Sequence, residues 1–453
     1  MDVKIKKLRI SPSLQILIGY LLIILIGAFL LCLPISNSNG QWLNFLDSFF
    51  TSTSAVCVTG LLVVDTAIQF TLFGEIVILF LIQIGGLGII AVTSFIFMVL
   101  KKKINLHNRM TIQESLNKET IQGVVKFIKK IIIISLIIEL IGVLLLLYST
   151  ISYTHSFWKG LYFAIYMSIS SFCNAGFDVL GESGKEFLSL SAFANDVAML
   201  LPIMMLIIIG GIGFIVLFDL LSKEKNKQHT KVVLVMTVIL LFGGGIIFTL
   251  FEWNNPSTLG NMPWYNKILN GFFQSVTTRT AGVSTINQNL LTTGSRIATM
   301  MLMFIGGAPN STAGGIKVTT IFIILLFMFR SPNENGDIRL KDRKVSRKVV
   351  MRAFRTIAYT IFMLVIAVLL MRILEPESIS FESILFECIS AISTVGLTMG
   401  ITPMLTIGSK CVLILLMFVG RVGLITFVMA ISNRITNSQS QEIEFANTDI
   451  IIG

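Results

Sequence analysis

A short turn that ends in glycine occurs four times along the chain, and it constrains the fold more than any other feature. Each copy follows an aromatic-rich amphipathic run and precedes a long apolar segment. The turn glycines are Gly60, Gly176, Gly282 and Gly396, separated by 116, 106 and 114 residues. Recurrence at a nearly constant spacing is the signature of internal duplication. The alternative is four unrelated apolar loops that each contain a glycine.

A second feature repeats in step with the first and argues against that alternative. Paired residues lie 26, 35, 25 and 25 residues after the turn glycines, counted to the second member of each pair: Gly85-Gly86, Gly210-Gly211, Gly306-Gly307 and Gly420-Arg421. Two independent features that recur together predict four duplicated units. In the last pair Arg421 replaces a glycine, and an arginine within an apolar segment has to face protein or a water-filled cavity. A buried ion pair with Glu75 or Glu139 is the alternative to a pore-facing arginine.

Composition places the four units in a membrane. Of 453 residues, 54% are hydrophobic and 13% are charged, against roughly 25% charged in soluble domains. The net charge of +11 would suggest nucleic-acid binding in a soluble protein, but the lysines and arginines cluster between apolar segments. We therefore expect a lipid membrane as the surroundings and no nucleic-acid partner. The positive-inside rule puts these clusters and both termini in the cytoplasm.

Each unit is predicted to contain a span, a short pore helix, the glycine turn and a return span. The predicted fold is therefore an all-α polytopic membrane protein with eight spans, in four repeats around one pseudo-fourfold central pore. The repeats are expected at 1–100, 101–221, 222–330 and 331–432, followed by a cytoplasmic tail at 433–453. The second begins with a basic amphipathic connection at 101–130. The predicted return spans are Phe73–Leu100, Ala192–Leu221, Ile297–Phe329 and Ile407–Ile431.

The turns are candidates for a cation filter. Thr394-Val395-Gly396 matches the first three residues of the potassium-channel loop, whose backbone carbonyls replace the hydration shell of the ion. Each pore helix would aim the negative end of its dipole at the turn that follows. Potassium is expected on carbonyls of four segments: Val56, Cys57, Val58, Thr59, Gly60; Phe172, Cys173, Asn174, Ala175, Gly176; Thr278, Arg279, Thr280, Ala281, Gly282; and Ile392, Ser393, Thr394, Val395, Gly396. The Arg279 side chain is expected to point behind its turn.

The third return span contains a candidate gate. Its glycine pair opens a run of small and polar residues that no helix would continue through: Gly306, Gly307, Ala308, Pro309, Asn310, Ser311, Thr312, Ala313, Gly314, Gly315 and, two residues on, Lys317. Broken backbone at membrane depth is tolerated where protein or water satisfies its polar groups. We expect this loop inside the pore, with Arg421 at the same level and hydrogen-bonded to it. A passive kink is the alternative.

These turns, the loop and Arg421 together resemble the Trk/Ktr/HKT superfamily of potassium transporters, over roughly residues 14–431. Eight spans without an extra N-terminal pair are similar to the membrane subunit of the Ktr branch. The resemblance implies potassium uptake across a bacterial cell membrane and a homodimer with one pore per subunit. It also implies a cytosolic regulatory ring of the KtrA or KtrC kind, which would bind nucleotide itself. This chain would bind no cofactor beyond potassium, with sodium coupling left open.

Two other functions were considered. A sodium-permeable member of the same superfamily would carry serine at the first filter position, where this chain has Gly60. A membrane-embedded enzyme would need a nucleophile with its base, or metal ligands, within the spans. The three histidines lie outside the predicted spans, and the five cysteines have neither disulfide nor metal-ligand spacing. We therefore expect no enzyme activity.

Overall fold

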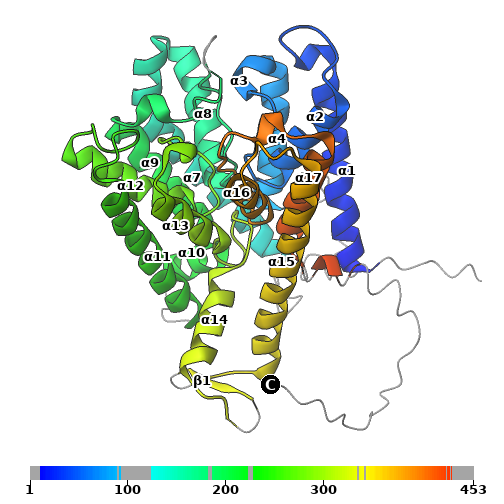
Figure 1. Ribbon diagram of the computed structural model, residues 1–453, viewed down its shortest axis with the longest axis vertical. Helices are drawn as coiled ribbons and strands as arrows, with labels where there is room; N and C mark the ends of the chain where they lie inside the picture. The colour runs from blue at the N-terminus through cyan, green and yellow to red at the C-terminus, as the bar shows by residue number, and fades with distance from the viewer. Residues whose placement is uncertain are drawn as a thin grey trace, which may run out of the picture.

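The computed structural model describes residues 11–88, 91–92, 124–181, 186–222, 228–333, 336–340, 343–424, 426–428 and 430. The predicted amphipathic connection, as far as residue 123, and the tail 433–453 lie outside these residues. Within the described part the chain is mostly helical (Figure 1). Its one sheet there is a hairpin of two short antiparallel strands, β1 (Ile338–Leu340) and β2 (Arg343–Val345), with Ile338 opposite Val345.

Four helices in the described part are long and apolar enough to cross a membrane: α1 (Pro12–Cys32), α7 (Val124–Thr154), α11 (Gln228–Glu252) and α15 (Arg347–Leu374). A bent pair of helices, described below, would make a fifth if it counts as one span. The long helices expose many large apolar side chains, among them Leu22, Leu144 and Phe362. Because apolar side chains that face outward at this density are compatible with lipid rather than water, the chain is a membrane protein.

Each long helix is followed by a short helix that packs against it: α2 (Phe45–Val56), α8 (Phe157–Cys173), α12 (Trp264–Thr277) and α16 (Phe381–Ile392). The last turns of all four are buried. The amphipathic aromatic runs of the sequence predict these short helices over Trp42–Ser54, Ser156–Ser171, Trp264–Thr277 and Phe381–Ala391. These bounds lie within three residues of the observed ones at either end, and those of α12 are identical. Two of them begin at a side-chain N-cap, where Asn44 accepts from the Leu46 amide and Ser380 accepts from the Ser383 amide.

The return segments are α4 (Leu72–Leu87), α9 (Val197–Ile212), α13 (Thr293–Phe304) with α14 (Val318–Phe329), and α17 (Ile407–Val422). The first, second and fourth of these return segments are shorter than the predicted return spans. They end at Gly88, Gly213 and Gly423, whose φ angles are 87°, 95° and 92°. Glycine adopts this left-handed region without steric cost, so the helix stops there. After Gly213 the chain continues as α10 (Phe214–Leu221), bent by 98° from α9.

Short elements complete the described chain. Four of them lie between a turn and the return helix that follows it: α3 (Thr66–Gln69), η2 (Ser191–Phe193), η3 (Gln288–Leu290) and η4 (Thr402–Met404). The fifth, η1 (Pro34–Ser36), lies between α1 and α2. The hairpin joins α14 to α15 at the far end of the molecule from α2 and α8 (Figure 1). Sequence analysis had treated this basic connection only as a charged link, and it missed the hairpin.

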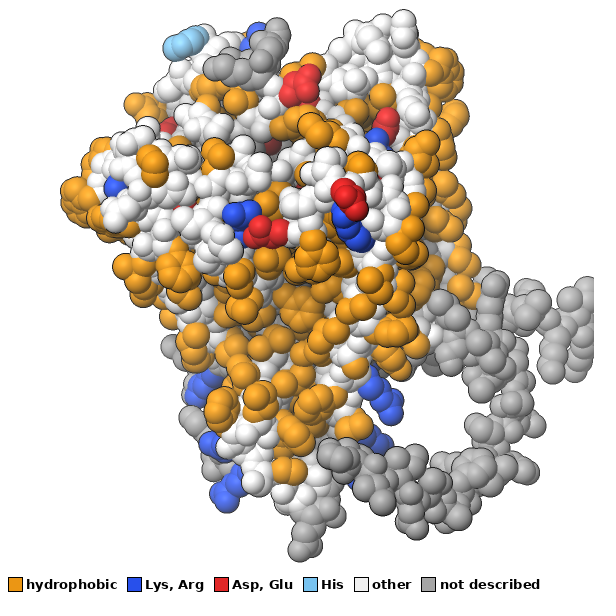
Figure 2. Space-filling model, in the orientation of Figure 1, with side chains coloured by type: hydrophobic (Ala, Val, Ile, Leu, Met, Phe, Trp, Pro, Cys, Tyr) orange, Lys and Arg blue, Asp and Glu red, His pale blue; other side chains and the backbone are white. Residues whose placement is uncertain are grey.

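Charge is distributed unevenly along the long axis. Figure 2 shows a broad hydrophobic band across the middle of the molecule, with Lys and Arg side chains below it. The acidic side chains visible on this face lie in the upper half, some of them beside basic ones. The described residues also form ion pairs between Arg296 and Glu382 and between Lys410 and Asp47, both with 2.8 Å between nitrogen and oxygen. The apolar band between two polar ends is the surface that a bilayer would cover.

Candidate functional site

The four turn glycines meet in a closed ring. A Cβ atom added at Gly60 would lie 2.8 Å from the Cα of Gly176, and one at Gly176 would lie 3.2 Å from the Cα of Gly282. A Cβ at Gly282 would lie 3.2 Å from the Cα of Gly396, and one at Gly396 would lie 2.9 Å from the Cα of Gly60. The order around the ring therefore follows the order along the chain. Only glycine fits at these four positions without displacing its neighbour.

Carbonyl oxygens point into the space between the turns. The added Cβ at Gly60 would lie 2.7 Å from the Ala175 oxygen, that at Gly176 would lie 3.1 Å from the Ala281 oxygen, and that at Gly282 would lie 2.5 Å from the Val395 oxygen. At Gly396 it would overlap the oxygen of Thr59. Each turn thus presents the carbonyl before its glycine to the glycine of the preceding turn around the ring. The result is a ring of four oxygens, from Thr59, Ala175, Ala281 and Val395.

Backbone conformation explains this direction. In every turn the glycine and the residue two positions before it have positive φ: 55° at Val58, 58° at Asn174, 72° at Thr280 and 50° at Thr394. The residue between them does not, so the backbone alternates in handedness and successive carbonyls face the same side. Left-handed φ costs a non-glycine residue roughly 1–2 kcal/mol. Strain of this kind persists where the surroundings over-determine it, and it clusters at functional sites.

The pore helices hold the turns from behind. The amides of Thr59, Ala175 and Val395 each donate to a carbonyl five residues earlier, on Ser54, Ser170 and Ser390, at 2.8 Å. The Gly60 amide donates to Ser54 Oγ at 3.0 Å and the Gly396 amide to Ser390 Oγ at 3.1 Å. Because the amides point outward to the pore helices, the carbonyls are left to face the ring.

Sequence analysis missed these serines. Ser54, Ser170 and Ser390 each stand six residues before a turn glycine, and that interval could have identified them. Ser170 Oγ donates to the Phe177 carbonyl at 2.6 Å, just beyond its glycine. In the third turn Thr277 has the corresponding role and donates to the Val283 carbonyl.

Three of the predicted filter carbonyls do not face the ring. A Cβ added at Gly85, Gly210 or Gly420 would overlap the oxygen of Val56, Phe172 or Ile392, respectively. The first carbonyl of these turns therefore lies against a return helix. This close approach is the physical reason for glycine at the first position of these three pairs, because any side chain there would push the helix off the turn.

The interrupted return segment crosses beneath the second and fourth turns. Its ends are tied together, since the Gly306 amide donates to the Ile316 carbonyl at 2.8 Å and the Val318 amide to the Gly307 carbonyl at 3.1 Å. Ala308 donates through its amide to the Gly211 carbonyl at 2.9 Å, and Thr312 Oγ1 donates to the Phe172 carbonyl at 3.1 Å. On the other side, a Cβ at Gly314 would overlap the hydroxyl of Thr394.

Arg421 of α17 connects this loop to α4. Its Nη1 donates to the Thr312 carbonyl, and its Nη2 donates to the carbonyls of Gly85 and Gly86, the second at 3.2 Å. The expected hydrogen bond between Arg421 and the loop is therefore confirmed. The alternative ion pair is not formed, because Glu139 accepts from Gln83 Nε2 at 2.9 Å and Glu75 from the Tyr162 hydroxyl at 2.6 Å.

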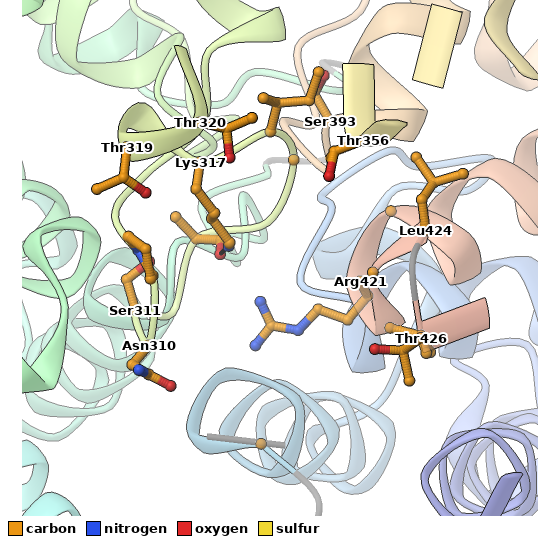
Figure 3. Close-up of a pocket in the computed structure, with 18 of the residues that line it drawn as sticks. Asn310, Ser311, Lys317, Thr319, Thr320, Thr356, Ser393, Arg421, Leu424 and Thr426 are labelled. Atoms are coloured by element: carbon orange, nitrogen blue, oxygen red, sulfur yellow. Dashed lines mark hydrogen bonds between the residues drawn. The ribbon is translucent and has the colours of Figure 1, made fainter. Parts of the chain in front are cut away.

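A cavity of about 450 Å³ lies beside this contact. Figure 3 shows the Arg421 guanidinium reaching across it toward the loop that carries Asn310 and Ser311. Lys317 reaches into the same region, and its Nζ donates to the Ala313 carbonyl at 2.7 Å. Ser393 of the fourth turn also lines the cavity, so this space begins directly below the ring. Three cationic residues line it: Lys317, Arg352 and Arg421.

Arg279 lies in the third turn, but its side chain leaves the ring. It is 7% exposed, and its Nη2 is 3.4 Å from Thr237 Oγ1 of α11. The expectation that this side chain points behind the turn is confirmed.

The acidic side chains outside the basic connections have more than one role. The sequence predicts from them an acidic outer face that would concentrate cations, made of Asp47, Asp178, Glu182, Glu186, Glu252, Glu375, Glu377 and Glu382. However, Glu252 and Glu375 are only 1% and 6% exposed. Glu252 accepts from the amide and hydroxyl of Thr292, and Glu375 accepts from those of Thr406. Both carboxylates therefore anchor the first turn of a return helix. For these two residues, burial and hydrogen bonding overturn the prediction of an exposed charge.

A ring of backbone carbonyls at the centre of an apolar helical bundle is the kind of site found in membrane proteins that translocate ions. The chain belongs to the TrkH family, described as cation transport proteins, which matches residues 15–442. It is 39% identical to the potassium/sodium uptake protein NtpJ of Enterococcus hirae, over 98% of each chain. It is 37% identical to the Ktr system potassium uptake protein B of Bacillus subtilis, over 100% of this chain and 99% of that one.

The fold is also that of a solved structure. The potassium transporter TrkH from Vibrio parahaemolyticus superimposes with a TM-score of 0.72. The match covers 95% of this chain and 86% of that chain, at 18% sequence identity. At this identity the likeness concerns the fold.

Proposed function

We propose that this chain is the ion-translocating subunit of a Ktr-type potassium uptake system. The observation that carries the proposal is the ring of inward carbonyls at Thr59, Ala175, Ala281 and Val395. With the carbonyls of their neighbours in each turn, such oxygens can replace the water around a dehydrated K⁺ ion. The names of the relatives support potassium as the ion. Since Val56, Phe172 and Ile392 present their carbonyls to return helices, the proposed coordinating set omits them.

The proposed architecture is four repeats with eight spans around one central pore, divided as in the sequence analysis. The fourfold succession of long helix, short helix, turn and return helix supports it. Both termini and the basic connections are placed in the cytoplasm, and the short helices enter from outside. The position of lysine and arginine at one end of the hydrophobic band supports that orientation. The cell membrane of a bacterium is the proposed location.

The four turns would act together on the ion. The four short helices, α2, α8, α12 and α16, each end at a turn. Their four dipoles therefore direct their negative ends toward the ring. Glycine at all four positions keeps the passage free of side chains. A sodium-permeable transporter is the second candidate, favoured by the word sodium in the name of the Enterococcus relative. The same name also bears on whether potassium uptake is coupled to sodium.

Below the ring, residues 306–315 and Lys317 are proposed to form the gate together with Arg421. The hydrogen bonds from Arg421 to Thr312 and α4 support a closed arrangement in which the charges of Lys317 and Arg421 border the ion path. Opening would withdraw the loop and the guanidinium together. We assign control of that step to a cytosolic nucleotide-binding ring on the basic face, and we assign a homodimer as the assembly. The Ktr system named for the Bacillus relative supports a partner subunit.

Uptake of rubidium or potassium by a bacterium that lacks its own potassium uptake systems tests the function. Expression of the chain should restore growth at low potassium and rubidium uptake, measured with and without sodium. Gly396→Ser should lower the preference for potassium over sodium, because a side chain would enter the ring. Gly400→Ser is the matched control, since Gly400 also has positive φ, 84°, but has no atom near its absent Cβ. No uptake by the expressed, membrane-inserted wild type would overturn the proposal.

The assembly has its own test. Light scattering of the purified protein should give the mass of a dimer, and a KtrA-like ring should co-purify with it. Removal of residues 433–453 tests whether the ring binds the tail or the basic connections. Unchanged capture of the ring would restrict the contact to the connections.

A further inference from the structure

One formal charge distinguishes the third filter turn from the other three. The residue three positions before each turn glycine is Cys57, Cys173, Arg279 or Ser393. Arginine is protonated at every accessible pH. The filter therefore has a fixed positive charge in one quadrant and neutral side chains in the same place in the others.

No carboxylate in the described part of the chain forms an ion pair with this charge. Arg279 is 93% buried, since its exposed fraction is 7%. Its hydrogen-bond acceptor among the described residues is Thr237 Oγ1, at 3.4 Å, and its Nε has no partner there. Thr237 is itself 3% exposed. The charge is thus held within the protein, where solvent and salt screen it weakly.

The position of the charge explains how it is tolerated. Arg279 follows directly after Thr278, the C-cap of α12. The C-terminal end of a helix carries a partial negative charge that favours a cation. Arg279 therefore offsets the dipole of α12, which would otherwise act on the ion in the ring. The other pore helices keep theirs, so the field around the ring is weaker on the third side.

A weaker field acts unequally on ions of different charge. The Coulomb energy between a fixed charge and an ion is proportional to the charge of the ion. A repulsion that lowers the affinity for a monovalent cation by some factor lowers that for a divalent cation by about the square of the factor. We propose that Arg279 is a specificity-determining residue that excludes divalent cations from the filter. This inference rests on the proposed cation-conducting function.

Block of rubidium uptake by external Ba²⁺, a divalent ion close to K⁺ in size, tests this role. In Arg279→Gln the apparent KM for Rb⁺ should fall by about 3-fold, and the inhibition constant for Ba²⁺ should fall by about 10-fold. Arg279→Lys keeps the charge and should restore the wild-type ratio of the two constants. Equal factors for the two ions, or no change in either, would overturn the proposal.

A second pair of variants works even if Arg279→Gln does not reach the membrane. Thr237→Asp would place a carboxylate beside the guanidinium and neutralise its charge while keeping the side chain. Thr237→Asn is its uncharged match and should behave like the wild type. The aspartate should raise sensitivity to Ba²⁺ by about the square of its effect on Rb⁺. The same constants in both Thr237 variants would contradict the role. If the wild type takes up no Rb⁺, the proposed function fails instead.

Discussion

Arg421 of α17, the fourth return helix, donates from its guanidinium to the carbonyl of Thr312, in the loop that interrupts the third return segment. The same side chain also donates to the carbonyls of Gly85 and Gly86 in α4, the first return helix. One residue therefore holds three separate return segments at one level below the ring. Because all its acceptors are backbone carbonyls, the guanidinium keeps its full positive charge there.

Removal of this side chain should open the pore. In Arg421→Ala the loop loses a tether and the cavity loses a positive charge, so we expect rubidium flux to rise by roughly tenfold. Deletion of 308–312 should have the same direction of effect, and both variants should depend less on the regulatory partner. Flux through membrane vesicles of known protein content is the measurement. Arg421→Lys keeps the charge but cannot bridge the same carbonyls, and it separates repulsion from tethering. Wild-type flux in all three variants would leave the loop as a passive kink.

The orientation of the chain can be tested by cysteine labelling. In a background where the exposed Cys411 is replaced by serine, Asn39→Cys should react with an impermeant maleimide added outside. Lys344→Cys in the hairpin, where the side chain is 75% exposed, should react only after permeabilisation. External labelling of the hairpin position would reverse the topology, because both sites are accessible in the fold and differ only in side.

The serine behind the fourth turn should matter for selectivity. Ser390→Ala removes the acceptor of the Gly396 amide, and an unpaired buried donor costs about 1–3 kcal/mol. The turn should become less rigid, so we expect a lower preference for potassium over sodium and a lower melting temperature. Ser390→Thr keeps the hydroxyl and is the control. A lower melting temperature with unchanged selectivity would show that the hydroxyl stabilises the fold without shaping the filter.

The outer mouth should respond to external pH. Burial raises the pKa of Asp178 to about 7; the hydrogen bond from the Leu180 amide lowers this pKa, and the nearby Asp65 carboxylate raises it by less. Asp178 stands two residues after Gly176, so its charge acts on arriving cations. We expect the KM for Rb⁺ to increase as external pH falls through about 7, and Asp178→Asn to abolish that dependence.

Thermal stability should change in the opposite direction. The folded pKa of Asp178 is above its usual value of 3.8, so the folded state binds its proton more tightly than the unfolded chain does. Its contribution to stability is therefore present at low pH and is lost as pH rises toward about 7. Asp178→Asn should melt at a higher temperature than the wild type at pH 8. Equal melting temperatures there would argue that the carboxyl is ionised at ordinary pH.

Much of the local structure could be predicted from the sequence because local rules decide it. The bounds of α12, the turn glycines and the break within the third return segment follow from apolar periodicity, glycine and proline. These signals depend on neighbours within a few residues. The same rules failed at Gly88, Gly213 and Gly423, where the predicted spans ran on past a glycine that ends a helix. A single glycine within an apolar run permits either outcome.

The sequence by itself determined which residues come together: four turns at matched spacing, and Arg421 in the place of a paired glycine. Only the tertiary structure decided which way their groups point. The carbonyls of Val395 and Ile392 are three residues apart, yet one faces the ring and the other lies against Gly420. Likewise, Glu252 proved to be a buried anchor for Thr292 rather than an exposed charge. A carbonyl direction depends on the sign of φ, and at Thr394 contacts from Gly314 and the pore helix, distant in sequence, hold φ at its strained value.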